Sequence, residues 1–400
     1  MPPKSSWEGM WQEVVVILVL VLSAVTLVSV LCLYLPMRNV LERAADVQVT
    51  ITPAHEVDLR LVQEALAILE EHYYTELPER QKLLYGAIQG MCGELDPYTR
   101  HLPPPQRAAE RGVLAGRSIR YGTVGLWVIK EGESFVVKPI AGSAAAQADV
   151  KEGEILVKVE GQSLNAEMST GQVRDLLRGE EGTTVAVTCR RPDGTEHAVE
   201  LARGQLEEPS VLWMRLHDEL GLIAVSTFTE QTPDELEQAM RALQGVGGLI
   251  LDLRESPGGL LSAAVETAGC FLERALVCYE EKREGGPIAY HAAPRDVTTD
   301  VRLVVLVGRN TMSAAEILAA ALKENGRAIL IGEPTSGKRM VQRAYDLSDG
   351  SCLHVTESIW LTASGESFDT GIAPDVEVEG EGAQLAEAMG YLREEAHEQP

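Results

Sequence analysis

From about residue 220 to the C-terminus, the hydrophobic pattern alternates between the two-residue period of strands and the longer period of helices. We expect strands at 222–225, 248–253, 301–307 and 328–331, and helices at 232–243, 260–272, 314–323 and 384–392. This alternation is typical of an α/β core with a largely parallel sheet. The segment 340–362 differs, because a turn at Asp349 and Gly350 between two apolar runs predicts a hairpin.

The chain ahead of this core has other patterns, which predict separate domains. Helix-like spacing at 57–73 and 82–95 indicates a small helical unit, and short β-rich runs between 119 and 203 indicate a small β domain. A chain of 400 residues also exceeds the usual size of one hydrophobic core. We therefore predict five parts: a tail at 1–13, a membrane anchor at 14–35, a helical unit at 36–112, a β domain at 113–205 and the α/β core at 206–400.

The anchor is predicted from the run 14–35, which is apolar and carries no charge. As a helix, this run is long enough to cross about 30 Å of hydrocarbon, and Trp7, Trp11 and Tyr34 lie where interfacial aromatic residues are common. A cleavable signal peptide is the alternative, but no Ala-x-Ala site follows the run. We favour an uncleaved anchor, whose orientation the flanking basic residues do not define.

Charge and residue spacing argue against two classes of function. The formal net charge is −25 at pH 7 and no basic cluster offsets it, so nucleic acid is not an expected partner. The six cysteines form no Cys-x-x-Cys pair, and the histidines form no His-Glu-x-x-His pattern. We expect neither a metal site nor a cofactor.

The segment 332–338 matches the spacing Gly-x-x-x-x-Gly-Lys of a phosphate-binding loop. The next residue is Arg339, where magnesium binding needs Ser or Thr, and the chain then continues as a predicted strand. Without a following helix N-terminus, the loop lacks the main element that holds phosphate. We therefore reject this interpretation.

Ser313 lies at the turn from a predicted strand to a predicted helix, three residues before Glu316. This spacing is that of a capping box, which alone explains the serine. The same turn would also expose a nucleophile and place the amides of Ala314 and of Gly258 or Gly259 near an oxyanion. A lysine can activate a serine only when burial keeps its amine neutral, whereas a lysine in a loop is usually a solvated charge.

The segment 310–342, which includes both Ser313 and Lys338, resembles the active-site region of the C-terminal processing peptidases. In that family the serine precedes a glutamate by three residues, and the lysine follows a glycine 25 positions after the serine, as here. The resemblance implies a crotonase-like protease fold, with Ser313 as nucleophile, Lys338 as general base and Gln342 orienting the lysine amine. It also implies that the catalytic domain is extracytoplasmic. The segments 93–98, 251–260 and 371–375 are similar to the family as well, and 251–260 corresponds to its oxyanion loop.

The β domain resembles a PDZ domain in the segments 121–126, 161–164 and 176–179. In such domains an extended peptide adds to the edge of a sheet, so the amides of Val124, Gly125 and Leu126 are expected to hold its terminal carboxylate. A domain that only separates the anchor from the core is the alternative. Together the two resemblances imply a serine endopeptidase that cleaves proteins near or from their apolar C-terminal tails, and the run 14–35 predicts that it is anchored in a membrane.

Four positions differ from the usual family pattern. Arg339 replaces a glycine after the lysine, Ser336 stands where an aromatic residue is common, and Thr123 replaces a glycine of the peptide-binding loop. Glu324 replaces an aspartate, on which the proposed dyad does not depend. Arg339 leaves a second interpretation open. The chain could instead be a scaffold protein that binds peptides through its PDZ-like domain without cleaving them.

Overall fold

The computed structural model describes residues 59–117, 119–216 and 220–397, which belong to two compact units divided after Leu77. The described part of the first unit contains one helix, α2 (Arg60–His72), as the sequence predicts for 57–73. The predicted anchor at 14–35 lies outside the described residues. Among the residues that are described, no helix is long and apolar enough to cross a membrane.

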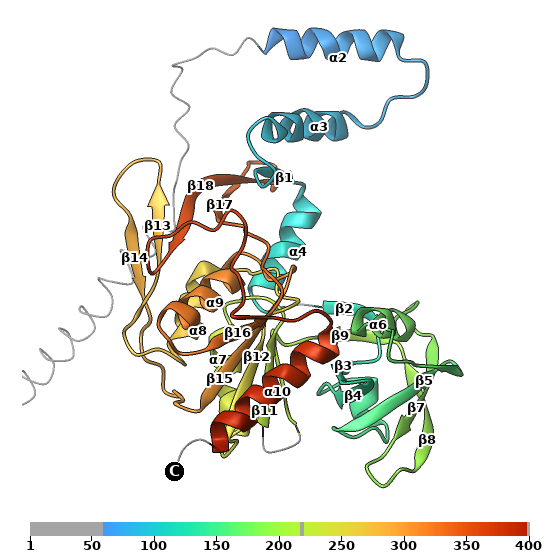
Figure 1. Cartoon of the computed structure of the whole chain (residues 1–400). Helices are drawn as coiled ribbons and strands as arrows, with labels where there is room; N and C mark the ends of the chain where they lie inside the picture. Colours follow the sequence, from blue (N-terminus) through green and yellow to red (C-terminus); the bar gives the residue numbers. More distant parts are fainter. Residues whose placement is uncertain (1–58, 118, 217–219, 398–400) are drawn as a thin grey trace, which may run out of the picture. The chain divides into compact units, whose positions relative to one another are not determined.

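The second unit contains a six-stranded sheet in which five strands are parallel (Figure 1). Its order is β10 (Val211–Arg215), β11 (Leu220–Val225), β12 (Gly248–Asp252), β15 (Arg302–Val307), β16 (Ile329–Gly332) and β19 (Val376–Glu377). Only the edge strand β10 is antiparallel to its neighbour. The sequence predicted the four central strands and their largely parallel arrangement, and missed both edge strands.

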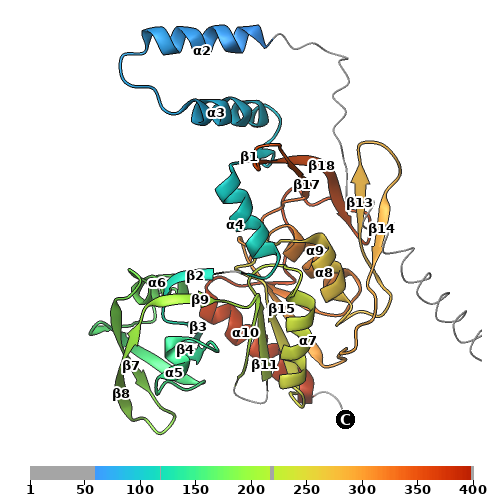
Figure 2. The ribbon, with the colours of Figure 1, turned by 180° about the vertical axis from the view of Figure 1, so that it is seen from behind.

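Helices cover both faces of this sheet, because successive side chains of a strand point to opposite faces. Ile223 and Leu251 pack against α7 (Thr232–Ala242), α8 (Leu261–Ala268) and α9 (Ala314–Glu324). Leu222 and Ile250 pack with α10 (Glu381–His397) on the other face, and Figures 1 and 2 show the two layers from opposite sides.

Helix α8 is shorter than the predicted 260–272. It ends at Ala268, where Gly269 lies so close to another segment that a side chain there would come within 1.9 Å of the Ala293 carbonyl oxygen. The pattern of apolar residues continues past this point, since Phe271 and Leu272 are buried in a turn rather than in a helix. A tertiary contact therefore ends the helix where the local sequence does not.

A second, antiparallel sheet lies beside the first and was not predicted as a sheet. Its order is β1 (Arg100–Leu102), β18 (Cys352–Thr362), β13 (Leu276–Lys282) and β14 (Ile288–His291), and β17 (Met340–Asp346) also pairs with β18. The hairpin predicted at 340–362 is confirmed as β17 and β18. Helices α3 (Arg80–Gly93) and α4 (Pro104–Leu114) flank β1, and α4 was also not predicted.

The β domain has a hydrophobic core of its own, which includes Phe135, Leu156 and Val185. Strand β3 is an edge strand of its main sheet, and α6 packs beside it. The elements are β2 (Ile119–Thr123), β3 (Leu126–Glu131), β4 (Ser134–Pro139), α5 (Ala144–Gln147), β5 (Glu154–Val159), β6 (Gln162–Ser163), α6 (Thr170–Leu177), β7 (Thr184–Arg190), β8 (Glu196–Ala202) and β9 (Gly204–Glu207).

The packing of the core sheet leads to a stability prediction. Leu251 of β12 is fully buried, so Leu251→Ala should lower the free energy of unfolding by about 2–5 kcal/mol in a denaturant titration. Leu95→Ala makes the same chemical change at a side chain that is 70% exposed and should cost less than about 0.5 kcal/mol. Equal losses in the two variants would contradict this description of the core.

Candidate active site

Three loops meet at the carboxyl edge of the parallel strands, as the sequence predicts for the loops after β12, β15 and β16. Buried Thr311 joins two of them, because its hydroxyl donates to the carbonyl of Leu253 at 2.8 Å. The Met312 amide donates to the Ser256 carbonyl, and the Ser336 amide donates to the Thr311 carbonyl, each at 3.0 Å. Main-chain hydrogen bonds therefore hold the three loops in register.

Ser313 occupies the turn between β15 and α9 in an unusual backbone conformation. Its φ is +56° and its ψ is −117°, a combination that L-residues rarely adopt. A residue held in such a region costs about 1–3 kcal/mol, which the surrounding structure must supply. The side chain is only half-buried, so the turn presents the Ser313 hydroxyl at the surface of the site.

The carboxylate of Glu316, in the first turn of α9, joins the serine loop to the lysine loop. It is fully buried, and one of its oxygens, Oε2, accepts hydrogen bonds from the amides of Ser313 at 2.8 Å and Lys338 at 3.0 Å. The other oxygen accepts from the Gly337 amide at 2.7 Å and from the Thr335 hydroxyl at 2.6 Å. All four partners donate, which suits a carboxylate at a helix N-terminus. Ser313 and Lys338, distant in the sequence, are thus bound to one oxygen atom.

Thr335 extends this arrangement to the segment that follows the hairpin. Its hydroxyl accepts from the Ile372 amide at 2.7 Å, and its own amide donates to the Ile372 carbonyl at 3.1 Å. Gly371 lies so close that a side chain there would come within 2.1 Å of the Thr335 carbonyl oxygen. The segment 371–375, which resembles the family, therefore supports the lysine loop from behind.

Lys338 has the surroundings of a lysine that loses its proton readily. Burial, followed by the positive charge of Arg100, lowers the pKa of the half-buried amine, and Glu316 opposes this shift. Among the described residues no acceptor receives a hydrogen bond from Nζ, which instead lies 5.2 Å from the centre of the Tyr98 ring. The Trp360 indole donates to the Lys338 carbonyl at 3.0 Å and fixes the backbone.

The loop after β12 brings glycine backbone against the serine. Gly258 has φ of +91°, and a side chain there would lie 2.6 Å from the Met312 carbonyl oxygen and 2.9 Å from the Ala314 nitrogen. Only glycine allows this close approach. Within the described residues, the amides of Gly258, Gly259 and Ala314 have no hydrogen-bond acceptor. Unpaired amides beside a serine are what an oxyanion hole requires.

The same loop is held at both ends. Gly259 forms an isolated parallel bridge with Phe228, and a side chain at Gly259 would meet the Phe228 backbone at 2.2 Å. Earlier in the loop, Arg254 donates to the Asp252 carboxylate at 2.6 Å and to the Glu381 carbonyl of α10 at 2.8 Å. These contacts fix the position of the predicted oxyanion donors before any substrate binds.

Gln342 is placed differently from the prediction, which has its amide bonded to the lysine amine. Its side-chain amide donates to the hydroxyl of Thr356 on β18 at 3.2 Å, and the described structure contains no hydrogen bond between Gln342 and Lys338. The pairing of β17 with β18 shifts register between Val341 and Gln342 and aligns Gln342 with Thr356. A register shift of this kind is not visible in the sequence.

The predicted peptide-binding residues lie at the start of the edge strand β3. Val124 and Leu126 are buried, and Gly125 between them has φ of +69°. The Thr123 hydroxyl accepts from the Gly125 amide at 3.2 Å. The family's usual glycine at position 123 would have no hydroxyl. Thr123 therefore gives the Gly125 amide, a predicted donor to the peptide carboxylate, an acceptor within the protein.

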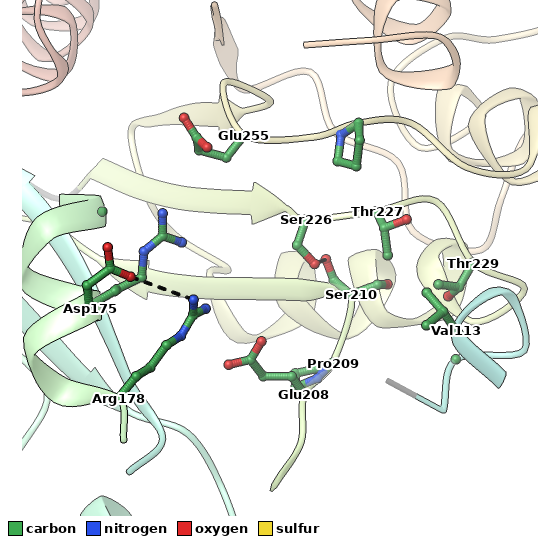
Figure 3. Close-up of a pocket in the computed structure, with 14 residues that line it drawn as sticks. Val113, Asp175, Arg178, Glu208, Pro209, Ser210, Ser226, Thr227, Thr229 and Glu255 are labelled. Atoms are coloured by element: carbon green, nitrogen blue, oxygen red, sulfur yellow. Dashed lines mark hydrogen bonds and ion pairs between the residues drawn. The ribbon is translucent and has the colours of Figure 1, made fainter. Parts of the chain in front are cut away.

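A polar cavity of about 530 Å³ lies between α6 and the loop that carries the oxyanion glycines. Figure 3 shows Arg178 of the segment after α6, Glu208 before β10 and Glu255 of the oxyanion loop around this space. Arg178 also lies 3.9 Å from Asp175. Its lining reaches the oxyanion loop as far as Pro257.

Comparison with known proteins identifies the family. Residues 219–378 match the model of peptidase family S41, and residues 135–191 match that of the PDZ domain. The carboxy-terminal processing protease CtpA of Bacillus subtilis is 34% identical over 316 residues, which cover 78% of this chain and 67% of that protein. The chain belongs to peptidase family S41. A chloroplastic C-terminal processing peptidase of Tetradesmus obliquus is 33% identical to this S41 peptidase over 337 residues, 78% of the chain and 72% of the relative.

Membership of the family makes the chain a serine-type endopeptidase that carries a PDZ domain. Among solved structures, a Bacteroides fragilis protein assigned to the S41 proteases aligns with a TM-score of 0.50 and 15% identity. This alignment covers 87% of the present chain and all of the other, and it shows a shared fold. The prediction of a C-terminal processing peptidase with a PDZ domain is confirmed.

Sequence reasoning missed part of this site. It identified Glu316 only as the partner of Ser313 in a capping box, and not as the residue that also binds the lysine loop. It noted Tyr98 only within a segment similar to the family. The rejection of a phosphate-binding loop at 332–338 is confirmed, because strand β17 follows Lys338 where a phosphate site needs a helix.

The role of Glu316 can be tested by a change of one atom. In Glu316→Gln an NH₂ group faces amides that need an acceptor, so the free energy of unfolding should fall by about 3 kcal/mol. A shift of the loops by about 1 Å should also lower kcat/KM about 100-fold. Glu324→Gln, at the exposed end of the same helix, is the control and should lose little of either. Similar losses in both variants would contradict the role of Glu316.

Proposed function

We propose that this S41 peptidase cleaves proteins near or from their C-terminal tails with a Ser313/Lys338 dyad. The observation that carries the proposal is the single Glu316 oxygen that binds the amides of both residues. Next to it lie the amides of Gly258 and Ala314, which have no acceptor in the part of the chain that the structure describes. The names of the two relatives, both C-terminal processing enzymes, support the choice of substrate end.

In the proposed mechanism the Ser313 hydroxyl attacks the peptide carbonyl while the neutral Lys338 amine takes its proton. The amides of Gly258 and Ala314, with Gly259 as the other candidate, bind the oxyanion of the tetrahedral intermediate. As the C–N bond breaks, the Lys338 ammonium returns the proton to the leaving amine. Water then attacks the acyl-enzyme with the same lysine as base and releases the serine. These steps need no metal or organic cofactor.

Substrate recognition is proposed to begin at the PDZ domain. The free edge of β3, which begins at Leu126, can pair with an extended apolar tail, and Val124 lies at the end of this edge. Since the Thr123 hydroxyl already binds the Gly125 amide, a terminal carboxylate must compete with it. The polar cavity beside Arg178 then leads toward the oxyanion loop.

We also propose that the run 14–35 anchors the enzyme in a membrane as a single helix, with the catalytic domain on the extracytoplasmic side. The support is the length of this uncharged apolar run together with its flanking aromatic residues. Detection of the intact N-terminus in a membrane fraction after an alkaline carbonate wash would test the uncleaved anchor.

A peptide-binding scaffold without catalysis is the second candidate, and Arg339 is the residue that raised it. The Arg339 guanidinium lies 2.6 Å from the Asp369 carboxylate and donates to the Ser367 hydroxyl at 2.9 Å. These partners hold the side chain on the segment before Gly371. A chain that binds apolar tails and never cleaves them would favour the scaffold.

The dyad predicts the behaviour of two alanine variants. Ser313→Ala and Lys338→Ala should each lower the rate of hydrolysis of fluorescein-labelled casein by at least about 10³-fold, because one removes the nucleophile and the other its base. Lys82→Ala removes an exposed lysine and should cleave casein at the wild-type rate. Unchanged turnover in either dyad variant would exclude the proposed assignment.

The lysine base also predicts the pH dependence of the reaction. Since only the neutral amine accepts a proton, kcat/KM should rise with pH through the pKa of Lys338. Burial and Arg100 lower this pKa, so the midpoint should lie below about 10.4, the usual value for lysine. A profile that falls with rising pH over this range would contradict a lysine base.

A further inference from the structure

The turn between α3 and β1 is closed by its own carboxylate. One oxygen of Asp96 accepts from the amides of Tyr98 and Thr99, each at 2.7 Å, and the other accepts from the Thr99 hydroxyl at 2.7 Å. Burial alone would raise the pKa of Asp96, but these hydrogen bonds outweigh it and lower the pKa. The turn is therefore rigid and carries the Tyr98 ring in a defined position.

This turn is fastened to the strand next to the lysine hairpin. The Thr356 hydroxyl of β18 donates to Asp96 at 3.2 Å, and the Thr356 amide donates to the Thr99 hydroxyl at 3.2 Å. The same Thr356 hydroxyl accepts from the Gln342 side chain at 3.2 Å. Immediately after the turn, Arg100 pairs with His354 across β1 and β18. A chain of hydrogen bonds thus runs from Asp96 through Thr356 to Gln342.

The Tyr98 ring lies against the Lys338 amine, with 5.2 Å between Nζ and the ring centre. Attraction between a cation and the ring would favour the ammonium form. Exclusion of water by the ring acts in the opposite direction, as does the charge of Arg100, while Glu316 of α9 favours the ammonium. Burial is the strongest of these influences on the Lys338 pKa, so the ring acts mainly as a cover.

We propose that the Asp96–Arg100 turn completes the catalytic centre, with Tyr98 positioning and covering the Lys338 amine and Asp96 holding Gln342 through Thr356. This inference rests on the proposed Ser313/Lys338 dyad and adds two positioning residues, Tyr98 and Asp96. Neither residue reacts with substrate. Tyr98 limits how much water reaches the base, and Asp96 closes the turn that carries Tyr98.

The cover can be tested with Tyr98→Ala and its matched control Tyr98→Phe, which keeps the ring. Without the ring, water reaches the amine and its pKa rises, so a smaller fraction of the base is neutral at pH 7. The hydrolysis of fluorescein-labelled casein by Tyr98→Ala should therefore fall about tenfold at pH 7 and recover toward high pH. Tyr98→Phe should keep the wild-type profile.

A chemical readout separates this inference from the proposed function. Trinitrobenzenesulfonate modifies only neutral amines, so its rate of labelling against pH, followed at Lys338 by peptide mass spectrometry, gives the midpoint without any proteolysis. The pH midpoint of Lys338 labelling should be higher in Tyr98→Ala than in the wild type and unchanged in Tyr98→Phe. Exposed Lys82 serves as the internal reference. An unmoved or lowered midpoint in Tyr98→Ala would overturn the inference. If wild-type protein cleaves no casein while the midpoint shifts as expected, only the proposed function fails.

The second positioning residue is tested by a double-mutant cycle. Asp96→Ala removes the acceptor of the Thr356 hydroxyl, and Thr356→Val removes the hydroxyl that binds Gln342. Each change interrupts the chain of hydrogen bonds and should lower kcat several-fold, with KM nearly unchanged. If Asp96 acts through Thr356, the double variant should be no slower than the slower single variant. Multiplicative losses, or losses in KM alone, would overturn the role of Asp96.

Discussion

The Glu316 carboxylate is fully buried, and three backbone amides and one hydroxyl donate hydrogen bonds to it. Burying an ionised group without such partners would cost several kcal/mol. The loops around Glu316 are therefore restricted to arrangements that keep these four donors in place. Because one oxygen binds both the Ser313 and the Lys338 amides, the position of the serine depends on the position of the lysine loop. The strained backbone of Ser313 is stable for the same reason, since the Glu316 bond to its amide helps to hold it.

The chemistry of the site follows from the contrast between two charges. Glu316 is buried but satisfied, whereas the Lys338 amine is half-buried and has no hydrogen-bond acceptor among the described residues. Burial therefore lowers the pKa of the lysine and makes its neutral form accessible. Tyr98 lies in the turn before β1, and Arg100 is the first residue of β1, which pairs with β18, so the second sheet contributes to the surroundings of the proposed base. The proposed catalytic site thus draws on both sheets and on helix α9.

Much of the core could be predicted from the sequence, because the relevant signals are local. The strands and helices after residue 220, the hairpin around Gly350 and the turn at Ser313 all depend on residues close together in the chain. The antiparallel sheet could not be predicted in this way, since β1 pairs with β18 across about 250 residues. The Glu316 contacts and the Gln342 to Thr356 bond also escaped, because a local capping pattern already explained the first and a register shift decides the second.

The central claim is that the amine at residue 338 is the base, and replacing that amine tests it most directly. In Lys338→Cys, alkylation with 2-bromoethylamine creates a lysine analogue whose chain sulfur lowers the pKa of the amine. The five native cysteines in the described residues are buried, and burial raises the pKa of their thiols, so the new thiol should react first. We expect alkylation to restore casein hydrolysis, with the rising limb of the pH profile displaced to lower pH. Fully alkylated protein that remains inactive, or a limb that stays at the wild-type position, would contradict the account.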